Sequence, residues 1–250
     1  MSTTRSFGAS VTRAVLLLAT AATTAAAQDS TARQTVDRGP SELARRSAGS
    51  VSFIQSRPQG AFSRNVGLGY GVDGAYLFRL DEAGLWSIRL SAGIVSYGAE
   101  SKRTALSESV GGRVLVDVKT RNYIAPLSIG PQLTWPKGSI RPYVNAGVGG
   151  QAFFTESHLE GTDDRTAFAS TTNHSSFAAS WGVGGGVYLP VYYGRTNLQL
   201  DLGVHYLNGG TTRYLAPGSI TDLPGARISV TPLESATHVV IVRLGARIGL

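Results

Sequence analysis

Apolar and polar side chains alternate with a period of two through most of the chain after residue 50. In the run 66–80 the even positions are apolar with one glycine among them, while the odd positions include three glycines, Asp73 and Arg79. A β-strand places successive side chains on opposite faces, so this pattern predicts a strand with one apolar face. Such runs lie at 50–57, 66–80, 86–95, 123–135, 140–154, 177–191, 198–206 and 240–250. The sequence therefore predicts an all-β fold of eight strands.

The connections between these segments fall into two length classes. Tight turns lie at 81–84, 136–138 and 192–196, and longer loops lie at 58–64, 98–112, 157–176 and 209–237. In an up-and-down barrel, alternate connections share a rim, so the three tight turns and both termini would lie together. Short turns on one rim and long loops on the other are typical of bacterial outer-membrane barrels, whose short turns face the periplasm.

Charged and amide side chains gather on the face opposite the apolar one. We assign nine of them to an interior polar network: Asp73, Arg79, Arg89, Arg141, Gln199, Asp201, His205, Arg243 and Arg247. A soluble barrel, the alternative, would bury these charges in its core at a high cost if they were unpaired. A membrane barrel places the apolar face in lipid and leaves no backbone edge unpaired. We therefore expect an eight-stranded antiparallel up-and-down transmembrane β-barrel.

Strand length and aromatic placement favour the membrane barrel. About 12 residues at roughly 3.3 Å each, tilted near 40°, span about 30 Å, which is enough for an apolar band of about 25 Å. Aromatic residues beside the short turns predict a girdle at the membrane interface: Tyr76, Phe78, Trp86, Trp135, Tyr192 and Tyr193. The apolar phase changes between Val114–Val118 and Tyr123–Trp135, which predicts a β-bulge within 119–122 near the outer rim.

The N-terminal segment has the features of an export signal. Arg5 and Arg13 give a positively charged start, an apolar core follows at 14–23, and Ala25-Ala26-Ala27 resembles a cleavage site. Residues 1–27 are therefore predicted to be a cleaved signal peptide. Residues 28–48 are polar and lack a period, which predicts a flexible periplasmic leader before a barrel domain at 49–250. No window holds the roughly 18 apolar residues of a membrane-spanning helix. Removing Arg5 and Arg13 with the signal peptide lowers the formal charge from +7 to +5, which is too modest to argue for nucleic acid.

The sequence offers few candidates for chemistry. The glycine runs at 67–71 and 182–186 are not followed by a helix, so they do not predict a phosphate loop. A loop metal site at His158, His174, Asp163 and Asp164 is an alternative to a solvated loop. In outer-membrane lipid A deacylases a strand histidine lies two residues from a nucleophilic serine, whereas Leu207 takes that place after His205. We expect no catalytic residue, metal or cofactor.

The central hairpin resembles those of small outer-membrane barrels. The residues that carry the resemblance are Ala125-Pro126-Leu127 with Gly130, then Pro136-Lys137-Gly138-Ser139, and Arg141-Pro142-Tyr143-Val144 followed by Gly147 and Gly149. Over about 50–250 the chain is similar to the OmpA transmembrane domain and OmpX and, more loosely, to OmpW-like proteins. Family members usually end in an aromatic residue read by the outer-membrane assembly machinery, whereas this chain ends in Leu250. The resemblance implies the fold and contact between the C-terminal strand and that machinery.

Three functions are compatible with these features. The first is a structural or surface-interaction role in the outer membrane, with the long loops facing outward toward an unidentified partner. The second is OmpW-like binding or passage of small hydrophobic molecules, which would need an apolar pocket at the outer mouth lined by residues such as Phe153, Leu207 or Ile241. The third is a lipid-modifying enzyme. The narrow interior of an eight-stranded barrel argues against an open channel.

Overall fold

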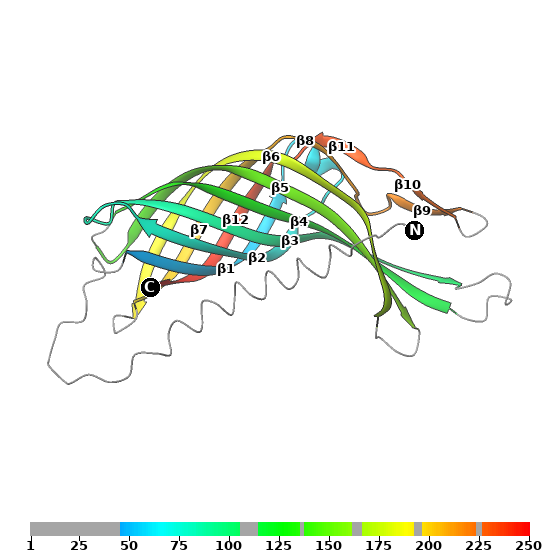
Figure 1. The fold of residues 1–250 in the computed structure, drawn as a ribbon, viewed down its shortest axis with the longest axis horizontal. Helices are drawn as coiled ribbons and strands as arrows, with labels where there is room; N and C mark the ends of the chain where they lie inside the picture. Colours follow the sequence, from blue (N-terminus) through cyan, green and yellow to red (C-terminus); the bar gives the residue numbers. More distant parts are fainter. Residues whose placement is uncertain (1–45, 106–114, 136–137, 162–166, 193–196, 224–226) are drawn as a thin grey trace, which may run out of the picture. The chain divides into compact units, whose positions relative to one another are not determined.

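The structure is a computed structural model and describes residues 46–105, 115–135, 138–161, 167–192, 197–223 and 227–250. All of its regular elements are strands except one short 3-10 turn (Figure 1). In chain order they are β1 (Ser47–Pro58), η2 (Phe62–Arg64), β2 (Gly69–Arg79), β3 (Trp86–Ala105), β4 (Leu115–Thr134), β5 (Arg141–Gly161), β6 (Ala167–Tyr192), β7 (Leu198–Gly209), β8 (Thr211–Tyr214), β9 (Ile220–Leu223), β10 (Arg227–Val230), β11 (Leu233–Ala236) and β12 (Val239–Gly249). Among these residues, no helix is long and apolar enough to cross a membrane.

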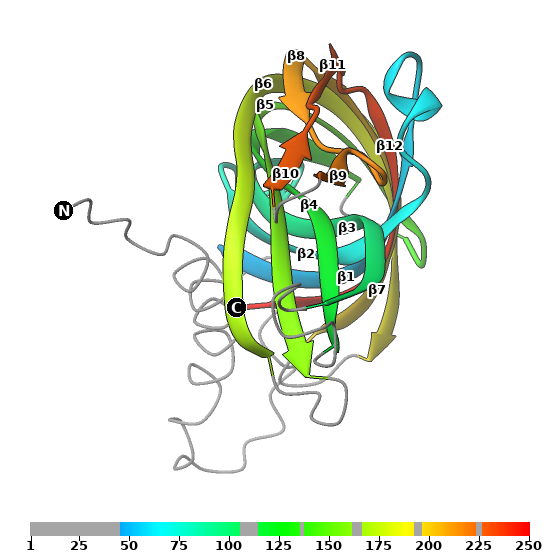
Figure 2. The same ribbon diagram turned by 90° about the vertical axis from the view of Figure 1, so that its right-hand side faces the viewer.

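Eight strands close into an antiparallel barrel. Around its wall the order is β1, β12, β7, β6, β5, β4, β3 and β2, and the last strand returns to the first (Figures 1 and 2). Each sequential neighbour pairs antiparallel, and β12 closes the ring by pairing with β1 from Pro58↔Val239 to Ala48↔Gly249. The predicted all-β, eight-stranded, up-and-down barrel is confirmed. The first strand begins at Ser47, so the barrel includes two residues that we expected in the leader.

The tight turns and the C-terminus share one rim, here called the short-turn rim. The N–H of Leu250 donates to the carbonyl of Ser47 (2.8 Å), which places the start of β1 beside the C-terminus. The turn after β2 is fixed by Asp81, whose carboxylate accepts the N–H groups of Leu85 (3.1 Å) and Trp86 (2.7 Å). Gly84 has φ +73° there, a backbone conformation that favours glycine. The opposite rim, where β1 connects to β2, β3 to β4, β5 to β6 and β7 to β12, is called the loop rim.

Four neighbouring strands extend far past the others at the loop rim. Strands β3 to β6 have 20, 20, 21 and 26 residues, whereas β1, β2, β7 and β12 have 11 or 12. The prediction of loops at 98–112 and 157–176 is therefore wrong for most of these residues, because 98–105, 157–161 and 167–176 are strand. We call the extensions 98–105, 115–122, 155–161 and 167–179 the projecting sheet (Figure 1).

The predicted bulge lies on the neighbouring strand. The register of β3 against β4 shifts between Ser96 and Gly98, opposite Tyr123 and Asn122, whereas β4 pairs with β5 without a shift from Val116 to Thr134. The extra residue is Tyr97, whose buried side chain donates from its hydroxyl to the carbonyl of Leu215 (2.9 Å). The bulge thus directs the Tyr97 side chain toward the barrel mouth. Our prediction placed the bulge within 119–122, on β4, and was wrong by one strand.

The last connection, between β7 and β12, contains regular structure. It contains two small sheets, in which β8 pairs with β11 and β9 pairs with β10. The β8–β11 pair follows directly from the β7–β12 hairpin, because only Gly210 separates β7 from β8. The segment 209–237, expected as a loop, therefore contains a strand pair that prolongs the barrel wall.

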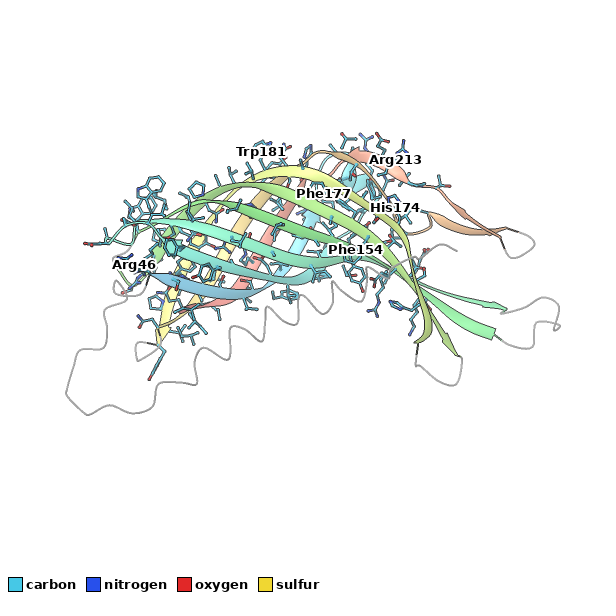
Figure 3. The ribbon with its side chains drawn as sticks, in the orientation of Figure 1. Arg46, Phe154, His174, Phe177, Trp181 and Arg213 are labelled. Carbon is cyan, nitrogen blue, oxygen red and sulfur yellow. The ribbon has the colours of Figure 1, made fainter. Side chains whose placement is uncertain are left out.

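Large apolar side chains cover the outer face of the barrel. The exposed ones along the strands include Val51, Phe53, Val72, Leu90, Leu127, Ile129, Val144, Val148, Val183, Leu202, Val204, Val242 and Leu244. Exposed aromatic residues form one belt near the short-turn rim: Tyr76, Phe78, Trp86, Trp135 and Tyr192. Tyr193, also expected there, lies outside the described residues. Near the loop rim, Tyr70, Phe177 and Trp181 are exposed in a second belt (Figure 3).

Candidate functional site

The interior of the barrel has a polar part toward the short-turn rim and an apolar part toward the loop rim. The polar part is centred on Asp73 of β2, which lies between two arginines from other strands. Its Oδ2 is 2.9 Å from Nε of Arg243 on β12 and 4.0 Å from Nη2 of Arg89 on β3. All three side chains are at most 7% exposed. The strands thus hold one carboxylate against two guanidinium groups in an environment that weakens ionic solvation.

Two stacked tyrosines connect the arginines to the rest of the polar part. Tyr143 and Tyr188 are fully buried with ring centroids 4.4 Å apart, and the guanidinium of Arg247 lies 4.7 Å from the Tyr188 ring centroid. The Tyr143 hydroxyl donates to Oδ1 of Asp201 (2.7 Å). Strand parity places both tyrosines on the inner face. The expected set left them out because it was chosen from charged, amide and imidazole side chains.

Amide side chains complete these contacts. Gln132 accepts from Nη1 of Arg89 (3.2 Å) and donates to the Tyr188 hydroxyl (3.0 Å). Gln199 accepts from Nη1 of Arg247, and His205 Nδ1 lies 3.0 Å from Oδ1 of Asn145. Gln132 and Asn145 were not in the expected set, although their strand parity places them on the same face.

Six of the nine expected residues, Asp73, Arg89, Arg243, Arg247, Gln199 and Asp201, are joined directly or through Gln132, Tyr143 and Tyr188. Asp73, Arg89 and Arg243 lie together, Gln199 lies with Arg247, and Asp201 and His205 are reached through Tyr143 and Asn145. Arg79 and Arg141 stand at the ends of β2 and β5 beside the short-turn rim, where both are half-buried. The network expected from parity is therefore several linked groups stacked along the barrel axis.

An apolar cluster fills the barrel at the loop rim and is called the mouth cluster. Its buried members are Ile54, Phe62, Val66, Val95, Tyr97, Ile124, Phe153, Ala178, Leu207, Tyr214, Ala216, Val239 and Ile241. Phe62, on the η2 turn, is completely buried, and its ring lies 4.8 Å from that of Tyr214 and 5.9 Å from that of Phe153, edge-on to both. The apolar mouth that we expected Phe153, Leu207 and Ile241 to line is present. Other side chains of this chain, such as Phe62 and Tyr214, fill it.

The connection between β7 and β12 spans the mouth from one wall to another. On β6, the Gly210 N–H donates to the Ala179 carbonyl (2.9 Å), and the carbonyl of Arg213 lies 3.1 Å from Nε2 of His174 (Figure 3). On β3, the Gly218 N–H donates to the Glu100 carboxylate (3.0 Å). Together with Phe62, this connection closes the upper end of the interior.

A small cavity separates the polar part from the mouth cluster. Its volume is about 30 Å³, and its lining includes Asp73, Arg89 and Arg243 on one side and Leu207 and Ile241 on the other. A space of this size with polar groups on one wall can hold about two water molecules. The geometry therefore suits internal hydration of the Asp73 ion group better than it suits a substrate.

Of the four residues named for a loop metal site, the structure describes His158 and His174. His158 lies 3.7 Å from the carboxylate of Glu156 and His174 contacts the Arg213 carbonyl, while Asp163 and Asp164 lie outside the described residues. No group of three metal-binding side chains occurs among the residues that the structure describes. Leu207, two residues from His205, is buried in the mouth cluster.

Comparison with known proteins gives matches among solved structures. No family model matches the sequence, and no curated protein matches it. Neisserial surface protein A matches at 10% identity over 82% of this chain and 97% of its own, with a TM-score of 0.42. Ail, the attachment invasion locus protein of Yersinia pestis, in complex with the heparin analogue sucrose octasulfate, matches at 14% over 81% and 96%, with a TM-score of 0.40. A major outer membrane protein from Thermus thermophilus matches at 15% over 80% and 98%, also at 0.40. These likenesses concern the barrel fold alone, which the strand pairing of this chain establishes independently.

Proposed function

We propose that this chain is an outer-membrane barrel that serves as a scaffold for interactions at the cell surface. The observation that carries the proposal is a closed barrel whose outer face is apolar and whose inner face is polar at mid-height. Such a surface is stable in lipid, where closure satisfies every backbone hydrogen bond in the wall. The two aromatic belts supply the side chains that favour the two membrane interfaces.

The orientation follows from the rims. The short-turn rim faces the periplasm, and the loop rim with its projecting sheet faces outward, as in other bacterial barrels. Residues 1–27 direct export and are cleaved, and the C-terminal strand β12 is the segment that the assembly machinery contacts. In this orientation the membrane lipid surrounds the apolar outer face, and the termini of the mature chain lie in the periplasm.

A scaffold role fits the interior better than passage of solutes does. The lower interior is filled by Tyr143, Tyr188 and their hydrogen-bonded neighbours, and the mouth cluster closes the upper end. What the chain offers to the outside is the projecting sheet, which lengthens one side of the wall by 7 to 13 residues in each of four strands. Interaction through this sheet is therefore the proposed role.

A second candidate is the binding of small hydrophobic molecules at the mouth, since Phe153, Leu207 and Ile241 face inward there. Phe62 would have to leave this site. A fluorescent fatty-acid probe should then bind the Phe62→Ala variant more tightly than the unsubstituted protein, while Ser63→Ala, a change at the adjacent exposed residue, should have no effect. Equal or absent probe binding in all three proteins would contradict this candidate.

The scaffold proposal is tested by location and labelling in whole cells. The chain has no cysteine, so single variants report one position each. Ser101→Cys, on the projecting sheet, and Ser139→Cys, at the short-turn rim, both replace exposed serines. A membrane-impermeant maleimide should label the first but not the second on intact cells, and both after lysis. The folded protein should also fractionate with outer membranes and shift in gel mobility on boiling. Labelling of Ser139→Cys on intact cells, or recovery as a soluble protein, would contradict the proposal.

A further inference from the structure

The small cavity beside the Asp73 ion group exists because several inward strand positions carry small residues. Ser91 of β3, Ser128 and Gly130 of β4 and Gly147 of β5 all line it. The interior of an eight-stranded barrel is just wide enough for ordinary side chains to fill it. Small residues on three adjacent strands therefore leave a space at the height where the buried charges lie.

Arg89 presents unused hydrogen-bond donors at this cavity. Its Nη1 donates to Gln132 (3.2 Å), whereas its Nη2 makes no hydrogen bond to any residue that the structure describes. Nη2 lies 4.0 Å from the Asp73 carboxylate, which is beyond hydrogen-bond distance. Each terminal nitrogen of a guanidinium carries two N–H donors. A side chain that is only 6% exposed thus has two donors left for an occupant of the cavity.

Two serines on the cavity wall supply a further donor. The hydroxyls of Ser91 and Ser128 lie 2.8 Å apart, and both residues line the space. Each hydroxyl has one proton, so only one of the two can donate to the other. The second proton is left for another acceptor, and the cavity is the space that both residues share.

The charges buried in the barrel do not balance. Among the residues that the structure describes, Arg89, Arg243 and Arg247 are buried in the interior with two carboxylates, those of Asp73 and Asp201. Asp73 lies 2.9 Å from Arg243 and 4.0 Å from Arg89, so Arg89 is the less well compensated of its two partners. Uncompensated charge is costly where water has little access. One additional negative charge beside Arg89 would balance the interior.

We propose that the cavity binds one small monatomic anion, chloride, held by Nη2 of Arg89 and by the Ser91–Ser128 hydroxyl pair. A chloride ion is only slightly larger than a water molecule, and a volume of about 30 Å³ accommodates one. Chloride accepts hydrogen bonds from these donors and also supplies the negative charge. Water would accept the same hydrogen bonds but would leave the charge of Arg89 uncompensated.

The site lies inside the wall, so it is independent of whatever the loop rim binds. The mouth cluster closes one end of the interior, and Tyr143 and Tyr188 fill the other. The ion is therefore enclosed as the barrel folds. An ion that binds only the folded state stabilises that state by mass action.

The test is urea unfolding and refolding of the full chain in phosphatidylcholine vesicles, in sodium chloride or in sodium gluconate of equal ionic strength. Gluconate is too large for the cavity. The unfolding midpoint should rise with the logarithm of chloride concentration near saturation of the site, and gluconate should not raise it. Equal midpoints in the two salts would mean that water alone occupies the cavity and would overturn the inference.

Three variants separate this site from general effects of salt. Arg89→Gln removes the unused donors and leaves two buried arginines with two aspartates, so the midpoint should no longer depend on chloride. Ser128→Val removes a hydroxyl and fills part of the cavity, and it should have the same effect if Arg89→Gln does not fold. Arg213→Gln removes an arginine from an exposed pair and should keep the dependence. Chloride dependence that persists in either folded cavity variant would overturn the inference.

Bromide locates the site directly. It has the charge of chloride and nearly its size, and it scatters X-rays anomalously. Crystals of the unsubstituted protein grown in sodium bromide should show an anomalous peak inside the barrel, between Arg89 and Ser128. Bromide peaks confined to the protein surface would overturn the inference and leave the barrel fold unaffected.

Discussion

At the scale of single residues, Asp73 has the most demanding environment in the barrel. Its carboxylate is shared by Arg243 and Arg89, and water has little access to any of the three side chains. Removing one partner from such a group leaves uncompensated buried charge, which costs far more than losing a surface pair. A second Arg–carboxylate pair, Arg213 with Glu234, has nearly the same separation of 3.0 Å but is exposed. Because the two N···O distances are nearly equal, a difference in stability contributed by the two pairs reports the effect of burial.

We predict that Asp73→Ala lowers the free energy of unfolding by about 3–5 kcal/mol, because two guanidinium groups lose their buried counter-charge. Glu234→Ala should lower it by only about 0–1 kcal/mol, since solvent screens the exposed pair. Urea unfolding of the folded protein in lipid vesicles measures both values. Similar losses for the two variants would show that the interior is wet enough to solvate the arginines alone.

Strand parity predicted the buried position of most polar residues, but it did not predict their contacts. It correctly placed Asp73 and Arg243 on one face, yet their neighbours depend on the register between strands far apart in sequence. It also did not show where the polar inner face ends, although we named Phe153, Leu207 and Ile241 as an apolar lining of the outer mouth. Near the loop rim both faces are apolar, because Ile54, Val95 and Ile124 pack against Phe62 inside the mouth. The period-two signal disappears where both faces of a strand are buried.

At the scale of strands, close approach in the wall requires glycine at particular positions. A Cβ added to Gly149 of β5 would overlap the carbonyl oxygen of Leu127 on β4, and backbone atoms there have little freedom to move. At Gly74 of β2, the nearest atoms would be 3.9 Å away, an ordinary contact distance. The same chemical change is therefore strained at one wall position and accommodated at the other.

Gly149→Ala should accordingly destabilise the barrel by about 1–3 kcal/mol through overpacking between β4 and β5. Gly74→Ala should change the free energy of unfolding by no more than about 0.5 kcal/mol. Both variants add one methyl group and can be compared by urea unfolding under the same lipid conditions. A Gly149→Ala protein as stable as Gly74→Ala would show that β4 and β5 are farther apart than described.

The extent of the strands was harder to predict than their number. The eight membrane-length segments alternate clearly because lipid on one side and a polar lumen on the other impose a pattern. No such constraint acts on 98–105 or 167–176, where a sheet outside the membrane can carry polar residues on both faces. Serines and threonines there resemble a loop in sequence, although backbone pairing continues through them.

At the scale of the whole molecule, the barrel is inverted relative to a soluble protein. Leu244 lies at the centre of β12 and is half-exposed, while Val191 is exposed at the end of β6 beside the short-turn rim. In a bilayer, Leu244→Arg should cost about 2–4 kcal/mol and Val191→Arg about 0–1 kcal/mol, because the cost falls with distance from the midplane. Unfolding from vesicles measures this difference. Equal costs would mean that the apolar outer face does not contact hydrocarbon.

The orientation of the outer face can be tested most directly without any substitution. All three tryptophans, Trp86, Trp135 and Trp181, are about half-exposed on the outside of the barrel, two in the belt near the short-turn rim and one near the loop rim. If this face lies in lipid, reconstitution into bilayers with brominated acyl chains should strongly reduce tryptophan fluorescence, while aqueous acrylamide should have little effect. Fluorescence that brominated lipid leaves unchanged and acrylamide quenches would contradict a transmembrane barrel.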